Sequence, residues 1–270
     1  MRNLPLIVLV AVTASTIYAK SSQDSIPEAN GALQLPYLDI SSVIDTYLED
    51  IVNPNLWVDT AILHLGYKGE SSMQPLTDSD YDAVAKELGV EPAVIKAVVD
   101  VETGKRHEGF WQEGKPLINF DLSMYRRFAP RHGVSLSKAQ KKAPVIFARP
   151  DVKRYGSQQA AQYARFDAAC EIDSASALES CFWGMFQIGG FNWKRCGTGS
   201  VEEFVRLMSR SERDQLELFT HFIAANNDMV KDLRKKDWLS FALKYNGPKA
   251  RSRGYHTRLA AAYDRHRKKS

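Results

Sequence analysis

The sequence predicts a mainly α-helical domain with one small β-hairpin. Signals that start and stop helices follow one another closely from Thr77 onward, whereas only residues 109–121 show the pattern of a short hairpin. The chain has 270 residues, of which 44% are hydrophobic and 25% charged, as is typical of a globular protein with one sizeable core. No internal repeat or low-complexity segment is visible in it.

Two helices are expected at the start of this domain. Thr77 or Asp78 can cap the first helix, which Gly89 ends. Pro92 suits the first turn of the second helix, which runs to the stop signal Thr103-Gly104.

Three further helices are expected nearer the C-terminus. Ser200 and Glu203 have the spacing of a capping box, and Ser211 can cap the helix that follows. Asp237 starts another helix, which Gly247-Pro248 ends.

The hairpin is predicted from two short apolar strands around a turn. Phe110-Trp111 forms the first strand, Glu113-Gly114 the turn, and Leu117 to Phe120 the second strand. Asp121 follows directly.

The N-terminus has the layout of a secretory signal peptide. Arg2 precedes an apolar run from Leu4 to Val12, and the small residues Ala14 and Ala19 are candidate cleavage points. We therefore expect residues 1–19 to direct export to the periplasm or the exterior. A buried N-terminal helix and an uncleaved anchor are the alternatives. Residues 20–76 are interpreted as a leader, a short helical segment and a linker, and residues 77–270 as the main domain.

Positive charge is concentrated at the C-terminal end. Residues 231–270 contain 13 Lys and Arg against three Asp and Glu, although the net charge of the whole chain is only +4. Such an end suits a polyanionic partner, whether nucleic acid, an acidic membrane surface or an anionic cell wall. A solvated helix face with a frayed tail is the alternative interpretation.

Cysteine and histidine give little indication of a metal site. Cys170, Cys181 and Cys196 allow one disulfide by three pairings in an exported protein. The six histidines are scattered without the spacing of metal ligands, so no metal site is predicted.

Glu102 is the strongest candidate for a catalytic acid. It extends the apolar stripe of the second helix, because it stands seven residues after Ile95 and four after Val98. Burial and the negative end of the helix dipole both disfavour the charged carboxylate, so we expect a raised pKa. A raised pKa is what a general acid needs near neutral pH. A carboxylate paired with a buried Arg or Lys is the alternative.

Asp121 is the candidate for a second catalytic carboxylate. Two carboxyl groups on opposite walls of one cleft are the usual equipment of glycoside hydrolysis. An equally physical alternative is that Asp121 caps a helix beginning near Leu122.

Two further segments suit a sugar-binding groove. Residues 183–192 interleave aromatic residues with Gly and amides, including Gln187 and Asn192, although a tightly packed turn would have a similar composition. Tyr245 and Asn246 end a helix and can also face the cleft. We expect Trp183 to lie in the core.

Four motifs together resemble the N-acetylmuramidase domain of modular phage endolysins. They are Val101-Glu102-Thr103-Gly104, the hairpin end Asn119-Phe120-Asp121, the run from Ser180 to Asn192, and the run from Phe241 to Pro248. The resemblance covers about residues 77–265, with the motifs in the family's order. Similar motifs occur in goose-type lysozymes and lytic transglycosylases.

The resemblance implies a lysozyme-like helical domain whose hairpin borders the active-site cleft. Its substrate would be bacterial peptidoglycan, with no cofactor and no nucleic acid partner, and a cognate inhibitor protein is a further expected partner. Glu102 matches the family's catalytic acid. Asp121 matches an acidic position that is usually Glu, and Leu122 and Ser123 replace the usual basic residue and His. The loop from Lys105 to Glu108 is longer than usual.

On this resemblance Glu102 would protonate the glycosidic oxygen, and Asp121 would orient or deprotonate water. Gln187, Asn192, Tyr245 and Asn246 would hold the glycan. The alternatives are a lytic transglycosylase and a wall-binding protein without activity.

Overall fold

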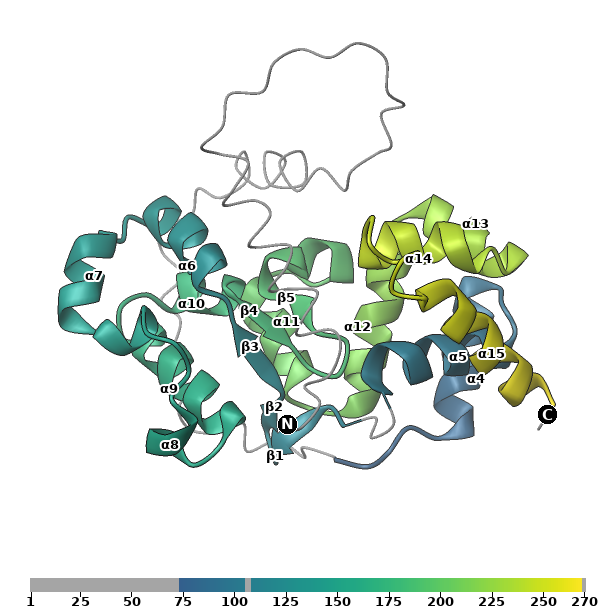
Figure 1. Ribbon diagram of the computed structural model, residues 1–270, viewed down its shortest axis with the longest axis horizontal. Helices are drawn as coiled ribbons and strands as arrows, with labels where there is room; N and C mark the ends of the chain where they lie inside the picture. Colours follow the sequence, from purple (N-terminus) through teal and green to yellow (C-terminus); the bar gives the residue numbers. More distant parts are fainter. Residues whose placement is uncertain (1–72, 105–107, 269–270) are drawn as a thin grey trace, which may run out of the picture.

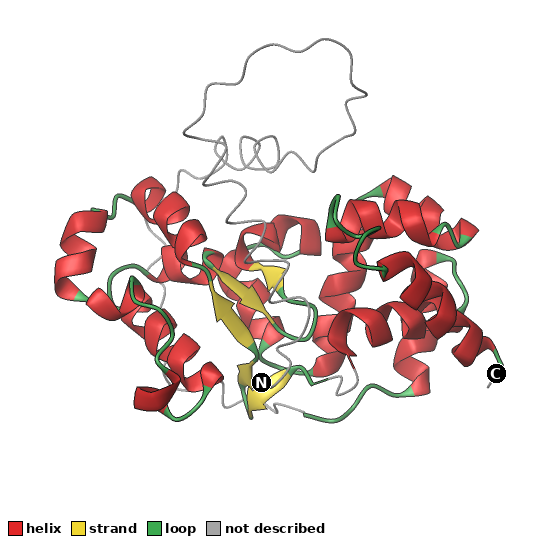
Figure 2. Cartoon of the chain, viewed as in Figure 1, coloured by secondary structure: helices red, strands yellow, loops and turns green. Residues whose placement is uncertain are grey.

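The computed structural model describes residues 73–104 and 108–268. The predicted signal peptide, residues 1–19, and the predicted leader and helical segment up to residue 72 lie outside these residues. The described part is mostly helical, with short antiparallel strands near its middle (Figures 1 and 2). The predicted mainly α class is confirmed.

The elements occur in a regular succession along the chain. The α-helices are α4 (Asp78–Leu88), α5 (Pro92–Thr103), α6 (Leu122–Phe128), α7 (Leu136–Lys142), α8 (Val152–Tyr155), α9 (Gln158–Cys170), α10 (Ser174–Glu179), α11 (Val201–Met208), α12 (Glu212–Ala224), α13 (Asn227–Lys235), α14 (Trp238–Asn246) and α15 (Tyr255–Arg267). The 3-10 helices are η2 (Ala129–His132), η3 (Pro144–Ile146) and η4 (Gly190–Cys196), and the strands are β1 (Phe110–Gln112), β2 (Lys115–Pro116), β3 (Ile118–Phe120), β4 (Cys181–Trp183) and β5 (Ile188–Gly189).

The first two helices begin and end where their capping residues predict. Thr77 caps α4 in a reciprocal capping box with Asp80, and Gly89 ends α4 in the left-handed conformation at a φ of 65°. Pro92 stands in the first turn of α5, and Gly104 follows its last turn. The capped starts at Ser200, Ser211 and Asp237 are confirmed in the same way.

The predicted single hairpin is wrong in its pairing. The strand expected from Leu117 to Phe120 does not pair with β1; instead Lys115–Pro116 completes the hairpin as β2. Residues Ile118–Phe120 form β3, which pairs with β4 in a second sheet ordered β3-β4-β5. The backbone changes partner at Leu117, whose N–H donates to Gly109 O and whose C=O accepts from Gly184 N. Sequence alternation shows that a strand forms but not which strand it meets.

The helices lie in two groups on either side of the strands (Figure 1). One group contains α6 to α10, and the other contains α4, α5 and α13 to α15. Helix α12 lies between the strands and the second group, so it links the two (Figure 1).

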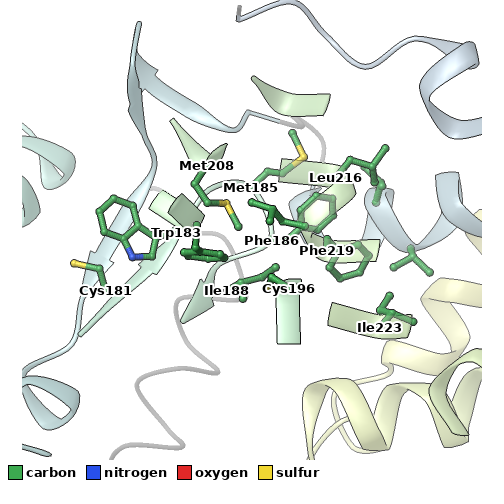
Figure 3. Packing of buried hydrophobic residues seen from close by; sticks show 14 of the residues in the cluster. Cys181, Trp183, Met185, Phe186, Ile188, Cys196, Met208, Leu216, Phe219 and Ile223 are labelled. Atoms are coloured by element: carbon green, nitrogen blue, oxygen red, sulfur yellow. The ribbon is translucent and has the colours of Figure 1, made fainter. Parts of the chain in front are cut away.

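The core is continuous from the β4–β5 turn to α12 (Figure 3). The ring of Phe186 stacks on Phe219 of α12, with centroids 4.1 Å apart. Trp183 is buried at 2% exposure and donates its indole N–H to Leu178 O at 3.0 Å, which confirms it as a core residue. Gly190 is required here, because a Cβ would stand 2.1 Å from Leu178 O.

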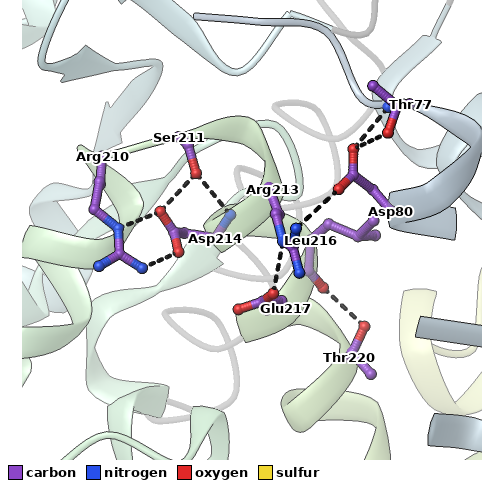
Figure 4. A network of polar contacts seen from close by, with 9 residues as sticks. All are labelled: Thr77, Asp80, Arg210, Ser211, Arg213, Asp214, Leu216, Glu217 and Thr220. Carbon is purple, nitrogen blue, oxygen red and sulfur yellow. Dashed lines mark hydrogen bonds and ion pairs between the residues drawn. The ribbon is translucent and has the colours of Figure 1, made fainter. Parts of the chain in front are cut away.

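Buried polar side chains of α12 form hydrogen bonds with the backbone next to β1, β4 and α11. Gln215 accepts from Met185 N and donates to Gly109 O and Met208 O, and Glu212 accepts from Gly109 N. At the start of this helix, Figure 4 shows Arg210 paired with Asp214 and Arg213 paired with both Asp80 and Glu217. These bonds fix α12 relative to α4 and to the segment before β1.

The basic C-terminal end is helical from Tyr255 to Arg267, as α15. Helix α15 packs more extensively against α5 than any other pair of helices packs. Arg265 and His266 both contact the carboxylate of Asp100 on α5, at 3.2 and 2.8 Å. The helix that carries Glu102 is therefore supported by the C-terminal helix.

The three cysteines are buried as free thiols. Burial raises the pKa of Cys170, Cys181 and Cys196 above the ordinary value for a thiol. Across residues 73–104 and 108–268, the helices are too short or too polar for any of them to span a membrane.

Candidate functional site

Glu102 is a buried carboxylic acid at the end of α5. Residues Val94, Ile95 and Val98 of the same helix are each about 1% exposed, and Glu102 continues their buried stripe at 2%. Burial raises the pKa of Glu102 to about 8, and it outweighs the lowering influence of Asn246 and of the Arg258 charge. Glu102 is therefore held mainly as the neutral acid near pH 7, as the sequence predicted.

Asn246, the last residue of α14, contacts Glu102 directly. Its side-chain N–H group donates to both carboxyl oxygens, Nδ2 to Oε1 at 3.2 Å and to Oε2 at 3.1 Å. Gly247 ends the helix at a φ of 78°, a conformation that favours glycine. The sequence predicted Asn246 as a residue that holds the glycan, and the structure places it against the acid.

Tyr245 lies beside the acid within an aromatic cluster. Its ring stacks on Phe241 with centroids 5.8 Å apart and meets Phe219 edge-on at 5.5 Å. Burial and the nearby charge of Glu102 raise the pKa of Tyr245 well above its usual value. Tyr245 therefore forms part of the wall around Glu102.

Two residues of α15 complete this wall, and the sequence reasoning missed both. Tyr255 is fully buried, and the Arg258 guanidinium lies 4.3 Å from its ring centroid. Burial and the Glu102 charge raise the pKa of Tyr255. The sequence contained a pattern that could have predicted both. Tyr255, Leu259, Ala262 and Tyr263 form an apolar stripe at helical spacing, and Arg258, three residues after Tyr255, lies beside it on the same helix.

Unpartnered polar atoms gather around the acid. Asn246 Oδ1, the Tyr255 hydroxyl and the Arg258 Nε and Nη2 atoms are buried, and none has a hydrogen-bond partner within the described residues. The Arg258 guanidinium is close enough to Tyr255 to lower the pKa of its hydroxyl, so Asn246 Oδ1 is the clearest unsatisfied atom of the cluster. Buried polar groups are usually satisfied, so this acceptor is suited to a water or another polar molecule.

Asp121 caps α6, which was the alternative interpretation of this residue. Its Oδ1 accepts from Ser123 N at 2.7 Å and from Met124 N at 3.0 Å. The side chain is 8% exposed, and its charge acts on the buried guanidinium of Arg165. The structure thus places Asp121 at the junction of β3 and α6, beside α9.

Gln187 and Asn192 lie on the segment that contains β5 and η4. Gln187 has a positive φ of 49°, which is unusual for a residue other than glycine, and its amide donates to Gly184 O at 2.8 Å. Asn192 is 9% exposed on η4. Both residues therefore lie next to β5, and not on the helices α5, α14 and α15 that surround Glu102.

The structure therefore brings together some of the predicted site residues. Glu102, Tyr245 and Asn246 form one cluster with Tyr255 and Arg258, joined by hydrogen bonds and close charges. Asp121, Gln187 and Asn192 stand on the strands and the segments next to them. Within the described residues, no group of three or more His, Cys, Asp or Glu side chains is placed to hold a metal ion.

This fold and this acid define a class of protein. The domain is mainly helical with small sheets, and it holds a desolvated carboxylic acid at a helix end, which is suited to general-acid catalysis such as glycoside cleavage. The model of the N-acetylmuramidase family matches residues 91–267, which is more than half of the chain. The chain belongs to this family.

A solved structure supports the same relationship. The chain is similar to the crystal structure of the Burkholderia AP3 phage endolysin, with 38% sequence identity and a TM-score of 0.60. The likeness covers 72% of this chain and 71% of that one. No curated protein sequence matches the chain. The resemblance to phage endolysin muramidases and the lysozyme-like fold are thereby confirmed, whereas the boundaries of the 77–270 domain stay a prediction.

Proposed function

We propose that this protein is an exported muramidase. It hydrolyses the β-1,4 bond between N-acetylmuramic acid and N-acetylglucosamine in bacterial peptidoglycan. Membership of the N-acetylmuramidase family and the likeness to an endolysin support peptidoglycan hydrolysis. The observation that carries the detailed proposal is the buried Glu102, with a pKa of about 8 and an amide donor on both carboxyl oxygens.

Glu102 acts as the general acid in this mechanism. The neutral carboxyl donates its proton to the glycosidic oxygen as the bond to the leaving sugar breaks. The product of that step is a carboxylate, which Asn246 Nδ2 stabilises by its hydrogen bonds. Activity that depends on the protonated form is lost as the pH rises through the pKa of Glu102.

Asp121 is proposed as the base that orients or deprotonates the attacking water. The two cap bonds at Oδ1 hold its carboxylate in one orientation at the start of α6. A carboxyl separation of about 6.5–9.5 Å leaves room for a water and gives net inversion at the anomeric carbon. Asp121 would then combine two roles, as a helix cap and as a base.

The glycan is held by side chains around these two carboxyls. Tyr245 and Asn246 contribute from the α14 side, and Gln187 and Asn192 from the sheet side. The unpartnered Asn246 Oδ1 supports this role, because it can accept from a sugar hydroxyl or an acetamido N–H.

The proposed place of action is the periplasm or the exterior. The N-terminal signal-peptide pattern in residues 1–19 supports export, and the substrate lies outside the cytoplasmic membrane. Cell fractionation of the full chain tests this part, since a protein found only in the cytoplasm would contradict it.

Digestion of purified cell wall tests the reaction itself. The expected products are muropeptides with a reducing N-acetylmuramic acid end, identified by mass spectrometry after borohydride reduction. Anhydromuramyl products, which borohydride does not reduce, would instead identify a lytic transglycosylase, which needs the acid but no water-activating base. They are lighter than the reduced hydrolysis products by one water and two hydrogens. Binding to the wall without release of any muropeptide would identify a protein that only binds it.

A further inference from the structure

The loop between α14 and α15 is unusually basic. Residues 247–254, which we call the 247–254 loop, contain Lys249, Arg251 and Arg253 and no Asp or Glu. Lys249 and Arg251 are exposed. Figure 1 shows this loop joining the end of α14 to the start of α15.

Lys249 and Arg251 are not used to hold the described part of the fold together. Elsewhere in the C-terminal stretch, basic residues pair with carboxylates, as Lys236 does with Glu91 at 2.6 Å and Lys244 does with Asp232. Lys249 and Arg251 make no ion pair with any residue in the described part of the chain. Two exposed cations without counter-charges are therefore available to a partner.

The loop backbone is well fixed. Ala250 is fully buried; its N–H donates to Gly247 O at 3.0 Å and its C=O accepts from Tyr255 N at 3.1 Å. Arg253 N donates to Lys249 O at 3.1 Å. Because the backbone is held, binding through the two cations costs little backbone conformational entropy.

The residues that flank the loop on each side lie close to Glu102, the proposed catalytic acid. Asn246 immediately precedes the loop and donates to Glu102, and the buried Tyr255 immediately follows it. Lys249 is three residues from Asn246 and Arg251 is five, so their Cα atoms lie within about 11 and 18 Å of it. The two cations therefore stand on a short loop whose flanking residues, Asn246 and Tyr255, lie close to Glu102.

The proposed substrate carries anionic groups that match this position. N-acetylmuramic acid bears a lactyl carboxylate, or a stem peptide with carboxylates of its own attached through that group. We propose that Lys249 and Arg251 of the 247–254 loop bind a carboxylate carried by the muramyl unit beside the scissile bond. This inference rests on the proposed function and names the part of the substrate that the loop recognises.

Three soluble glycan substrates distinguish the sources of the carboxylate. The first keeps its stem peptides. The second has lost them and carries free lactyl carboxylates, and the third is the second with those carboxyls converted to neutral amides. The measurement is kcat/KM at low salt for the wild type and for the Lys249→Gln/Arg251→Gln double variant. A Lys141→Gln/Lys142→Gln double variant is the matched control, because it removes two exposed charges from the end of α7, in the other group of helices.

The loop variant should lose about fivefold in kcat/KM on one or both charged substrates, the size expected for two exposed ion pairs. Loss on the peptide-bearing glycan alone assigns the peptide carboxylate, and loss on the free-carboxyl glycan assigns the lactyl group. The neutral glycan should be cleaved equally by wild type and variant, and the control should match the wild type on all three. Added salt should remove the difference, and Lys249→Arg/Arg251→Lys should keep wild-type activity.

An equal loss on the neutral glycan, or no loss on either charged glycan, would overturn this inference. Unfolding is checked by the melting temperature of each variant. A failure of the proposed function is distinguishable, because the wild type would then cleave none of the three substrates or would release anhydromuramyl ends from them.

Discussion

Glu102→Gln should stabilise the protein, and the gain should grow with pH. The pKa of Glu102 is about 8 in the folded protein and near the ordinary 4.5 once the chain unfolds. Below pH 4.5 both states carry the proton, so the carboxyl is neutral to stability. Between the two values the unfolded state releases its proton first, and folding stability falls as the pH rises.

The size of this effect follows from the two pKa values. At about 1.4 kcal/mol for each pH unit between them, burial of Glu102 costs on the order of 5 kcal/mol by pH 8. Gln has nearly the same shape and does not ionise, so the variant escapes this cost.

Urea unfolding at pH 4, 6 and 8 measures the difference in free energy of unfolding between variant and wild type. The difference should rise steadily over this range. The matched control is Glu113→Gln, which removes a carboxyl from the exposed β1–β2 turn. A Glu102→Gln difference that stays constant from pH 4 to pH 8 would refute a desolvated acid at this position.

Three further predictions concern the proposed partners of the acid and the basic helix. Asp121→Asn should keep the melting temperature, because Asn caps as well as Asp. If Asp121 acts on water, the Asn variant should lose activity and Asp121→Glu should keep part of it. Full activity in Asp121→Asn would show that Asp121 serves only as a helix cap. Asn246→Ala removes a bond that favours the charged form of Glu102, so the alkaline limit of activity should move up by about one pH unit; a pH–rate profile with an unchanged or lower limit would contradict this. Arg267→Ser/Lys268→Ser should weaken binding to whole walls at low salt and change little at high salt; binding insensitive to both would mark these charges as ordinary surface.

The wall-binding test replaces only Arg267 and Lys268 because Arg265, in the same basic segment, contacts another helix. The sequence presented the whole basic end as one tail, but Arg265 contacts Asp100 on α5 and so helps to support the helix of the acid. Replacing Arg265 would mix a loss of wall binding with a disturbed site. Arg267 and Lys268 are exposed near the end of α15.

Local chemistry explains why much of the helical fold was predictable. The starts at Thr77, Ser200 and Ser211 depend on a side-chain oxygen that accepts a backbone N–H two or three residues away, which is visible in sequence. The burial of Glu102 was predictable for a similar reason, because helical periodicity places it on the stripe of Ile95 and Val98.

Long-range pairing was not predictable in the same way. Strand β3 meets β4 some 60 residues further along the chain, and nothing local in Ile118–Phe120 specifies that partner. Arg258 was missed because a lone Arg in a basic stretch is usually a surface charge. Its position over Tyr255, close enough for its charge to lower the pKa of Glu102, depends on how α15 docks against α5.

The sequence admitted two interpretations of Asp121, as a helix cap and as a catalytic base. Both interpretations require an acidic residue directly after a strand. The cap to α6 is present in the structure. A carboxylate has several acceptor sites, so capping does not by itself exclude a second role. Kinetics of the Asn and Glu variants decide between the two.

The central claim is that Glu102 supplies the proton for glycan cleavage. The most direct measurement is the rate at which folded Glu102→Gln releases reducing ends from purified peptidoglycan at pH 6, with Glu113→Gln as the control. Loss of general-acid catalysis should lower this rate by about 100-fold or more, while the control keeps the wild-type rate. Turnover at the wild-type rate by a folded Glu102→Gln protein would contradict the account.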